Sequence, residues 1–145
     1  MKGPGTGETR YWTWHMAAGV AMLLLLGMHM VTMHLGSLTG LYIADRAEGA
    51  ASLANSQARD ASIFLTVVYI LLLGLALYHG LYGLRTILFE LTLRPSVERL
   101  VTVAFVIIGL GLFGLGTWAM LAAHGAAVAA VAKVALAGAT LAGTL

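Results

Sequence analysis

The sequence contains no cysteine and very little charge. Without cysteine the chain can form no disulfide, has no thiolate nucleophile and cannot ligate zinc or an iron–sulfur cluster through sulfur. Only 10% of its residues are charged and 60% are hydrophobic, too few charges to cover a soluble domain of 145 residues. The net charge of +2, with no basic run, gives no indication of nucleic-acid binding. The lipid bilayer is therefore the expected solvent of this chain.

Three apolar runs are each long enough to cross a bilayer, which takes about 20 residues. Helices are expected at about 11–36, 62–89 and 100–123, because backbone polar groups in lipid must bond within their own segment. The first run is too long for a signal peptide, so we expect it to remain as a helix. The predicted fold class is an all-α integral membrane protein, with 1–123 forming one transmembrane domain that joins a multi-subunit helical bundle.

Two segments lie outside these runs. The polar stretch 37–61 is expected to form a partly helical surface loop. The C-terminal segment 124–145 is apolar and rich in Ala and Gly, with Lys133 near its middle. It has two interpretations, a short interfacial helix or a fourth span, and we favour the interfacial helix.

Basic residues near the helix ends predict the orientation of the chain. The residues on the N-terminal side of the membrane are Lys2, Arg10, Arg85, Arg94 and Arg99, whereas Arg46 and Arg59 lie on the other side, joined by Lys133 if there are three spans. This bias predicts a multi-pass protein of the inner, or cytoplasmic, membrane with its N-terminus in the cytoplasm.

Histidine stands out among the ionisable residues of the predicted spans, whose interiors contain no Asp or Glu. A polar residue inside lipid is costly and suggests function, and neutral imidazole is a good axial ligand for haem iron. His79 is the first candidate, because Gly80 and Gly83 leave room for a flat ring beside it and Arg85 could meet haem propionates. The alternative for His79 is a buried histidine bonded across helices.

The other histidines differ in their expected depth. His29 lies deeper than His34 and is the favoured second ligand, whereas His34 is expected at the interface and His124 in an exposed place. His29 and His79 differ in height by about 15 Å, so one iron cannot bind both. If both are ligands, each serves a separate haem and needs a histidine from another chain.

His15 opens the first span among Trp12 and Trp14, where either a quinone contact or simple interfacial anchoring fits. His15 and His29 are 14 residues apart and lie nearly on one helical face, as in proteins that hold stacked haems. That arrangement needs the same spacing on a second helix, and the second run has a single histidine. We therefore disfavour it.

Four strings together support a resemblance that covers about residues 11–123. They are WTWHMAAGV, LGMHM, LALYHGLYGLRTILFEL and LGTWAML, of which His-Gly-x-x-Gly-Leu-Arg is the most specific element. With them the chain resembles the D-type membrane-anchor, or cytochrome b, subunit of succinate dehydrogenase (succinate:quinone oxidoreductase, complex II). Met16 and Ala18 depart from the family, whose members often have Arg and Ser there, and Glu90 stands where an acidic pair is common.

The resemblance implies haem axial ligands at His79 and His29, with Arg85 matching the arginine that follows the second-helix ligand. It implies one or two haems b shared with a second cytochrome b anchor subunit. It also implies an iron–sulfur subunit, an FAD-containing flavoprotein subunit and a membrane quinone, either menaquinone or ubiquinone. Electrons would pass from succinate to quinone, and no bond of succinate would be broken by this chain. The alternatives are a haem-free anchor of the same complex and a small scaffold or transport protein.

Overall fold

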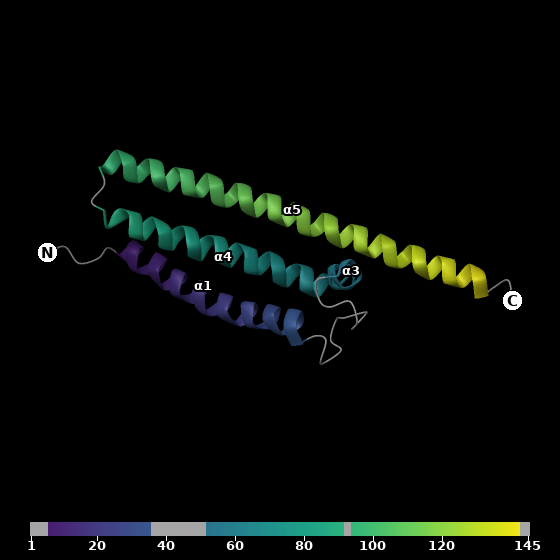
Figure 1. The fold of residues 1–145 in the computed structure, drawn as a ribbon. Helices are drawn as coiled ribbons and strands as arrows, with labels where there is room; N and C mark the ends of the chain where they lie inside the picture. The colour runs from purple at the N-terminus through teal and green to yellow at the C-terminus, as the bar shows by residue number, and fades with distance from the viewer. Residues whose placement is uncertain (1–5, 36–51, 92–93, 143–145) are drawn as a thin grey trace. The chain divides into compact units, whose positions relative to one another are not determined.

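The computed structural model describes residues 6–35, 52–91 and 94–142, and these residues form helices and no strand (Figure 1). Helix α1 spans Thr6–Met30 and continues as a π-helical turn, Val31–Leu35. Helix α3 is short, Leu53–Asp60, whereas α4 spans Ile63–Phe89 and α5 spans Pro95–Ala142.

Three of these helices are long and apolar enough to cross a membrane. Their apolar segments are Thr9–His34, Ile63–Phe89 and Pro95–Thr140. The all-α fold class with three candidate spans is therefore confirmed, and the chain is compatible with a multi-pass membrane protein. The predicted first helix began at about 11 and ended at 36, and Gly36 lies outside the described residues.

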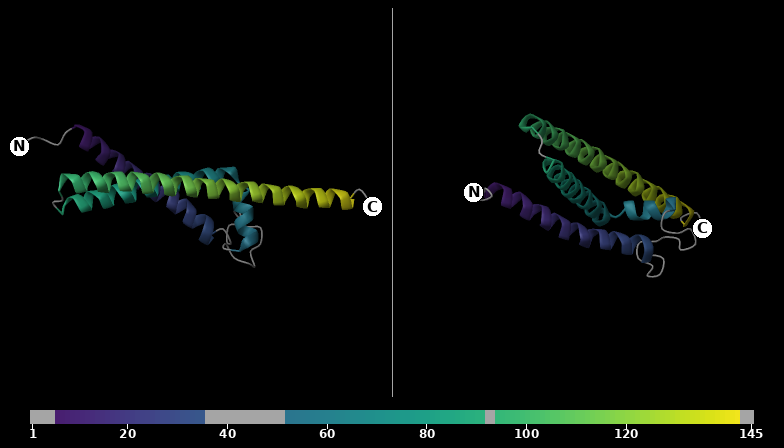
Figure 2. Two further views of the ribbon diagram at one scale, coloured as in Figure 1. Left: turned by 90° about the horizontal axis from the view of Figure 1, so that it is seen from above. Right: turned by 60° about the vertical axis from the view of Figure 1, so that its left-hand side comes forward.

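Helix α5 differs from the prediction, which ended the third helix at about 123 and began a separate tail. The structure instead has one helix of 48 residues that contains 124–142 (Figure 2). Its length is about 72 Å, more than twice the roughly 30 Å of a bilayer's hydrocarbon core. The helix continues because the segment contains no proline after Pro95 and is rich in alanine, the strongest helix former. Residues 143–145 of the predicted tail lie outside the described residues.

Helix α3 occupies the end of the predicted surface loop 37–61, whose residues up to 51 lie outside the described part. Ser52 is its N-cap, and the Ser52 hydroxyl accepts a hydrogen bond from the Asn55 backbone N–H at 3.2 Å. Asn55 and Arg59 are buried polar residues of this helix. The prediction of partial helix in this stretch is confirmed for the residues that the structure describes.

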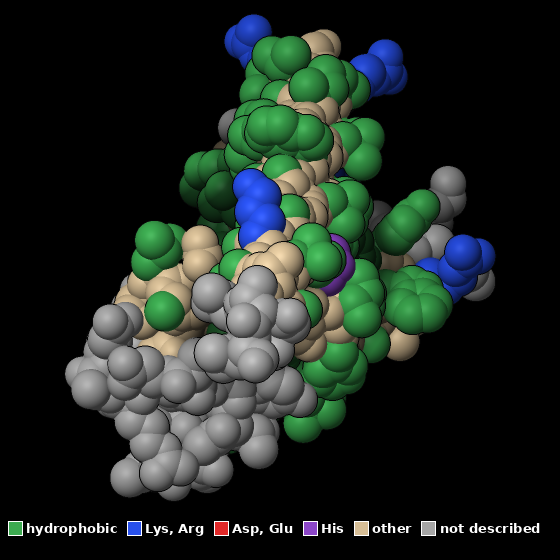
Figure 3. Space-filling view, turned by 90° about the vertical axis from the view of Figure 1, so that its right-hand side faces the viewer, with side chains coloured by type: hydrophobic (Ala, Val, Ile, Leu, Met, Phe, Trp, Pro, Cys, Tyr) green, Lys and Arg blue, Asp and Glu red, His purple; other side chains and the backbone are tan. Residues whose placement is uncertain are grey.

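The chain divides into two compact units, which are described separately. Unit 1 comprises Met1–Gly27 and Leu71–Gly116, and unit 2 comprises Met28–Ile70 and Thr117–Leu145. Apolar side chains are exposed along all three long helices. In Figure 3 hydrophobic side chains cover most of the described surface that faces the viewer, with Lys and Arg side chains standing singly among them. Such a surface suits contact with lipid or with other helices.

Glycines allow α4 and α5 to pack closely within unit 1. A Cβ atom added at Gly109 would lie 2.9 Å from Leu81 Cδ1, and one added at Gly116 would collide with Leu73. Gly111 and Gly114 have no such neighbour within 4 Å. The two glycines that face α4 are seven residues apart, two turns along one side of the helix.

Candidate functional site

His15 of α1 and His79 of α4 form a stacked pair in unit 1. Their ring centroids are 4.0 Å apart and their planes differ by 9°. Both side chains are half-buried. From the sequence, His15 was expected at the inner end of the first span, as a quinone contact or an interfacial anchor, and His79 in a haem site. Their contact was not predicted. Helix α1 therefore brings a second imidazole directly onto the predicted ligand.

Two glycines make room for this pair. A Cβ atom at Gly19 would lie 2.9 Å from His79 Cε1, and one at Gly83 would lie 3.4 Å from His15 Cε1. Each glycine follows the histidine of its own helix by four residues, in the pattern His-x-x-x-Gly. Because residues four apart share a helical face, each histidine packs against the glycine of the opposite helix. The pattern was visible in the sequence, but only for His79 was the glycine noted.

Hydrogen bonding distinguishes the two imidazoles. His79 Nδ1 lies 3.1 Å from the backbone carbonyl oxygen of His15. A carbonyl can only accept, so His79 Nδ1 is the donor of this hydrogen bond, and in the neutral imidazole Nε2 then has the lone pair. His15 Nδ1 is buried and has no hydrogen-bond partner among the described residues. His15 is also tilted against the ring of Tyr82, with centroids 5.0 Å apart.

His29 lies in unit 2 and has a different neighbour. Its ring meets the ring of Tyr69 edge-on, with centroids 5.4 Å apart and an interplanar angle of 77°. His29 Nδ1 is buried without a hydrogen-bond partner in the described part of the chain. The backbone carbonyl of His29 accepts a hydrogen bond from the Thr32 hydroxyl at 2.8 Å, just where the helix widens into its π-helical turn. His34, in that turn, is exposed.

The remaining predicted site residues are dispersed. Trp12 and Trp14 are 59% and 64% exposed, so they project away from unit 1. Gly83 lies against His15, and Gly80 has no neighbour within 4 Å. His124, expected to be exposed, is half-buried in unit 2, and its Nδ1 lies 2.6 Å from the carbonyl oxygen of Asp60.

Arg85 belongs to a different side of α4 from His79. Six residues separate them, which places their side chains about 120° apart around the helix. Arg85 Nε donates to the Thr102 hydroxyl at 3.0 Å, and its guanidinium carbon lies 4.1 Å from the centroid of the Phe89 ring. The structure thus ties Arg85 to α5, away from the histidine pair.

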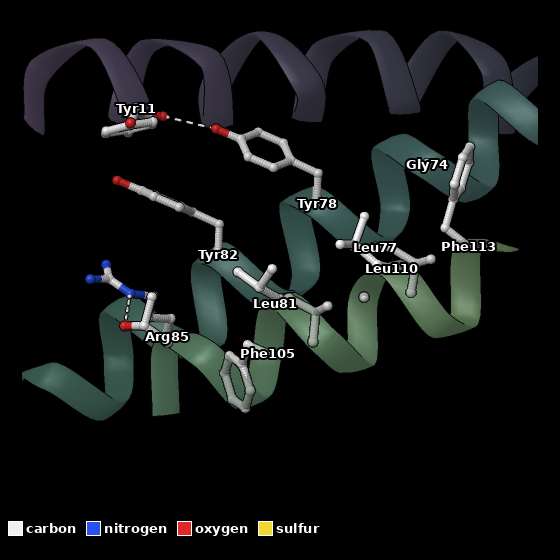
Figure 4. A pocket seen from close by; sticks show the side chains of 13 residues that line it. Tyr11, Gly74, Leu77, Tyr78, Leu81, Tyr82, Arg85, Phe105, Leu110 and Phe113 are labelled. Atoms are coloured by element: carbon white, nitrogen blue, oxygen red, sulfur yellow. Dashed lines mark hydrogen bonds between the residues drawn. The ribbon is translucent and has the colours of Figure 1, made fainter. Parts of the chain in front are cut away.

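Arg85 lines a groove between α4 and α5, which we name the α4–α5 groove (Figure 4). Its volume is about 680 Å³. Its polar lining residues are Tyr11, Tyr78, Tyr82, Arg85 and Thr102; the others are Gly74, Leu77, Leu81, Phe105, Val106, Gly109, Leu110 and Phe113. In Figure 4 the Tyr82 hydroxyl and the Arg85 guanidinium lie at one end, and Leu110 and Phe113 lie toward the other.

Of the polar residues of the groove, only Arg85 was singled out from the sequence, although a pattern linking it to two tyrosines was present. Tyr78, Tyr82 and Arg85 follow one another by four and three residues, the spacing of a single helical face. The Tyr78 hydroxyl donates to the Tyr11 backbone carbonyl at 3.3 Å, which connects this face to α1. Thr102 of α5 accepts the hydrogen bond from Arg85, but no sequence pattern around Thr102 indicated this role.

Within the described ranges, no group of three or more His, Asp or Glu side chains could hold a bare metal ion. Haem differs, because its iron needs only one or two protein nitrogens. Comparison of the chain with protein-family models, curated proteins and solved structures found no match.

Proposed function

We propose that this chain is a haem b-binding membrane-anchor subunit of a succinate dehydrogenase, which relays electrons between the soluble subunits and a membrane quinone. The observation that supports it best is the state of His79. With its Nδ1–H bonded to the His15 carbonyl, His79 is the tautomer whose Nε2 binds iron. The resemblance of the string His79-Gly-x-x-Gly-Leu-Arg85 to the anchor subunits supports the same assignment.

The stacking of His15 on His79 is compatible with this role. A histidine binds iron through the lone pair of Nε2, which lies in the plane of the ring, whereas His15 covers a face of the ring. No described residue makes a hydrogen bond to His79 Nε2. Because His15 lies stacked and nearly parallel on His79, His79 alone of this pair would hold the iron, and a further histidine would have to come from a second anchor subunit. His29 is the proposed ligand of a second haem, again with a histidine of that subunit.

When bound, haem b supplies a one-electron relay whose potential depends on ligand, burial and nearby hydrogen bonds. The residues of this chain orient the ligand and limit the access of water. The His15 carbonyl fixes the tautomer of His79, and the His15 ring limits rotation of the His79 ring. Gly19 and Gly83 keep the space for both rings.

The proposed assembly follows the resemblance. The iron–sulfur and flavoprotein subunits dock on the cytoplasmic side, where Arg10, Arg94 and Arg99 would lie with the N-terminus. The quinone site is formed jointly with the second anchor subunit. His15 remains its candidate contact from this chain, because it has an unpartnered Nδ1 among the described residues.

A haem-free anchor is the second candidate, and the histidine stack itself favours it, because the imidazoles already fill the space between α1 and α4. In that case His79 is a structural residue bonded across helices, and the same complex would contain no cytochrome b.

The test is a dithionite-reduced minus oxidised spectrum of the purified complex, with haem quantified as pyridine haemochrome. Variants His79→Ala and His29→Ala are compared with His34→Ala, which changes an exposed histidine. We expect each of the first two to remove one haem and the third to remove none. Loss of haem with His79→Ala alone would make His29 structural. Wild type without haem would leave the haem-free anchor, and purification without a flavoprotein subunit would contradict both.

A further inference from the structure

The α4–α5 groove has a polar end and a long apolar course. On α4, Arg85 lies at the polar end of the groove and Gly74 at the apolar end. The two are eleven residues apart. Eleven residues of helix rise about 16 Å, close to half of the roughly 30 Å hydrocarbon core. The groove thus has the length of a single membrane leaflet. Its polar end lies beside Tyr11, in the aromatic cluster that is typical of a membrane interface.

The guanidinium of Arg85 is fixed on one side by contacts within the chain, and its other N–H groups can bind an anion. Its Nε–H is taken by the Thr102 hydroxyl, whose own hydrogen goes to the Glu98 carbonyl at 2.8 Å, and Phe89 covers one face. The two terminal amino groups remain, and no carboxylate of the described residues forms an ion pair with them. A planar fork of N–H groups matches phosphate oxygens better than any neutral acceptor.

Near this end, Arg94 and Arg99 lie in the turn between α4 and α5 and at the start of α5, and their two positive charges are formally matched by Glu90 and Glu98. The charge of Arg85 is the one that remains. The Tyr82 hydroxyl points to the same end as Arg85 (Figure 4) and makes no hydrogen bond with the described residues. It can donate to a second oxygen of the same ligand.

We propose that the α4–α5 groove binds one anionic phospholipid. The phosphate is bound by Arg85 and Tyr82, and an acyl chain lies along Leu81, Val106 and Leu110 toward Phe113. An anionic headgroup is preferred, because the ammonium group of a zwitterionic lipid would lie close to the positive charge of Arg85. This site faces α5 and does not depend on haem binding at His79.

The test uses the full-length purified chain, freed of lipid in detergent and titrated with phosphatidylglycerol or phosphatidylcholine, with bound lipid counted by native mass spectrometry. We expect one phosphatidylglycerol to bind about fivefold more tightly than phosphatidylcholine, the worth of one arginine at a membrane surface. Arg85→Gln should abolish the preference. Lys133→Gln, which changes an exposed basic residue that does not line the groove, should keep it.

A second variant separates the groove from the charge. Val106 lines the groove but is 55% exposed, so Val106→Trp can fill the groove without disturbing the packing between helices. With circular dichroism showing unchanged helix content, this variant should lose the tight lipid although Arg85 is intact. Two results would overturn the proposal and leave only a simple anion contact. One is unchanged lipid binding by Val106→Trp, and the other is binding of inorganic phosphate to the wild-type chain as tight as that of phosphatidylglycerol.

Other occupants of the groove give distinct results. If a helix of a partner subunit fills it, Val106→Trp will release that subunit from the purified complex, and the isolated chain will show no lipid preference. If a quinone fills it, added quinone will displace phosphatidylglycerol from the wild-type chain. Either result overturns the lipid assignment, while the haem spectrum of the complex reports on the proposed function separately.

Discussion

His79 and His29 both lie in apolar helices and both were predicted as haem ligands, yet their surroundings differ. His79 is packed on one face by His15, hydrogen-bonded at Nδ1 and confined by Gly19. His29 touches the edge of Tyr69 and has a buried Nδ1 without a partner among the described residues. The first histidine has a defined tautomer, whereas the second has none set by the described residues.

The difference concerns whether a histidine is oriented for metal binding by residues of its own chain. A metal-binding histidine normally donates its second nitrogen to a carbonyl or carboxylate, which orients the ring. His79 has that support from its own chain, and His29 lacks it in the part that the structure describes. The two histidines should therefore respond differently to changes in this chain.

The largest change in the free energy of unfolding is expected from Gly19→Ala. The new methyl group would lie 2.9 Å from His79 Cε1 and would force the imidazole or α1 to shift. Overpacking of this kind costs about 1–3 kcal/mol, and the gain in helix propensity recovers only about 1 kcal/mol. The expected net loss is up to about 2 kcal/mol in the free energy of unfolding, measured by circular dichroism during titration with a denaturing detergent.

Gly27→Ala is the matched control, because Gly27 lies in the same helix and has no neighbour within 4 Å. It should leave the free energy of unfolding unchanged or raise it by up to about 1 kcal/mol. Equal effects of the two substitutions would show that His79 is not confined by Gly19.

A smaller effect is expected at the second histidine, from Tyr69→Leu. This change removes the edge-on aromatic contact with His29, which is worth about 0.5–1.5 kcal/mol beyond its buried area. Tyr69→Phe keeps the ring and should keep the free energy of unfolding, as measured by the same titration. A loss with Tyr69→Phe as large as with Tyr69→Leu would assign the effect to the hydroxyl instead.

The smallest effect is expected from Thr32→Val. It deletes the hydrogen bond from the buried Thr32 hydroxyl to the His29 carbonyl at the start of the π-helical turn. The expected cost is about 0.5–1 kcal/mol, the usual net value of one hydrogen bond. Thr13→Val deletes a similar bond to the Thr9 carbonyl at an exposed site close to the start of the first span, where interfacial water or a headgroup can replace it, and should have no measurable effect. A cost at Thr13 equal to that at Thr32 would contradict the role of burial.

The sequence alone determined the three long helices, because a bilayer demands about 20 apolar residues per span and internal bonding of every backbone group. It also identified His79 as a residue with a special setting, since the adjacent glycines are a local pattern. It did not determine the end of the third helix. Apolar, alanine-rich segments either continue or stop according to their environment, and no residue near 123 forces a break.

Only the tertiary structure decided which side chains meet. His15 and His79 are 64 residues apart, and their contact depends on the relative rotation and height of α1 and α4. Arg85 was predicted to meet haem propionates from its place toward the cytoplasmic end of the second helix, and this stays a prediction. Only the structure showed that Arg85 Nε donates to the Thr102 hydroxyl of α5. Hydropathy specifies that a helix is buried in lipid, whereas the partner of each face is set by packing between helices that are distant in the chain.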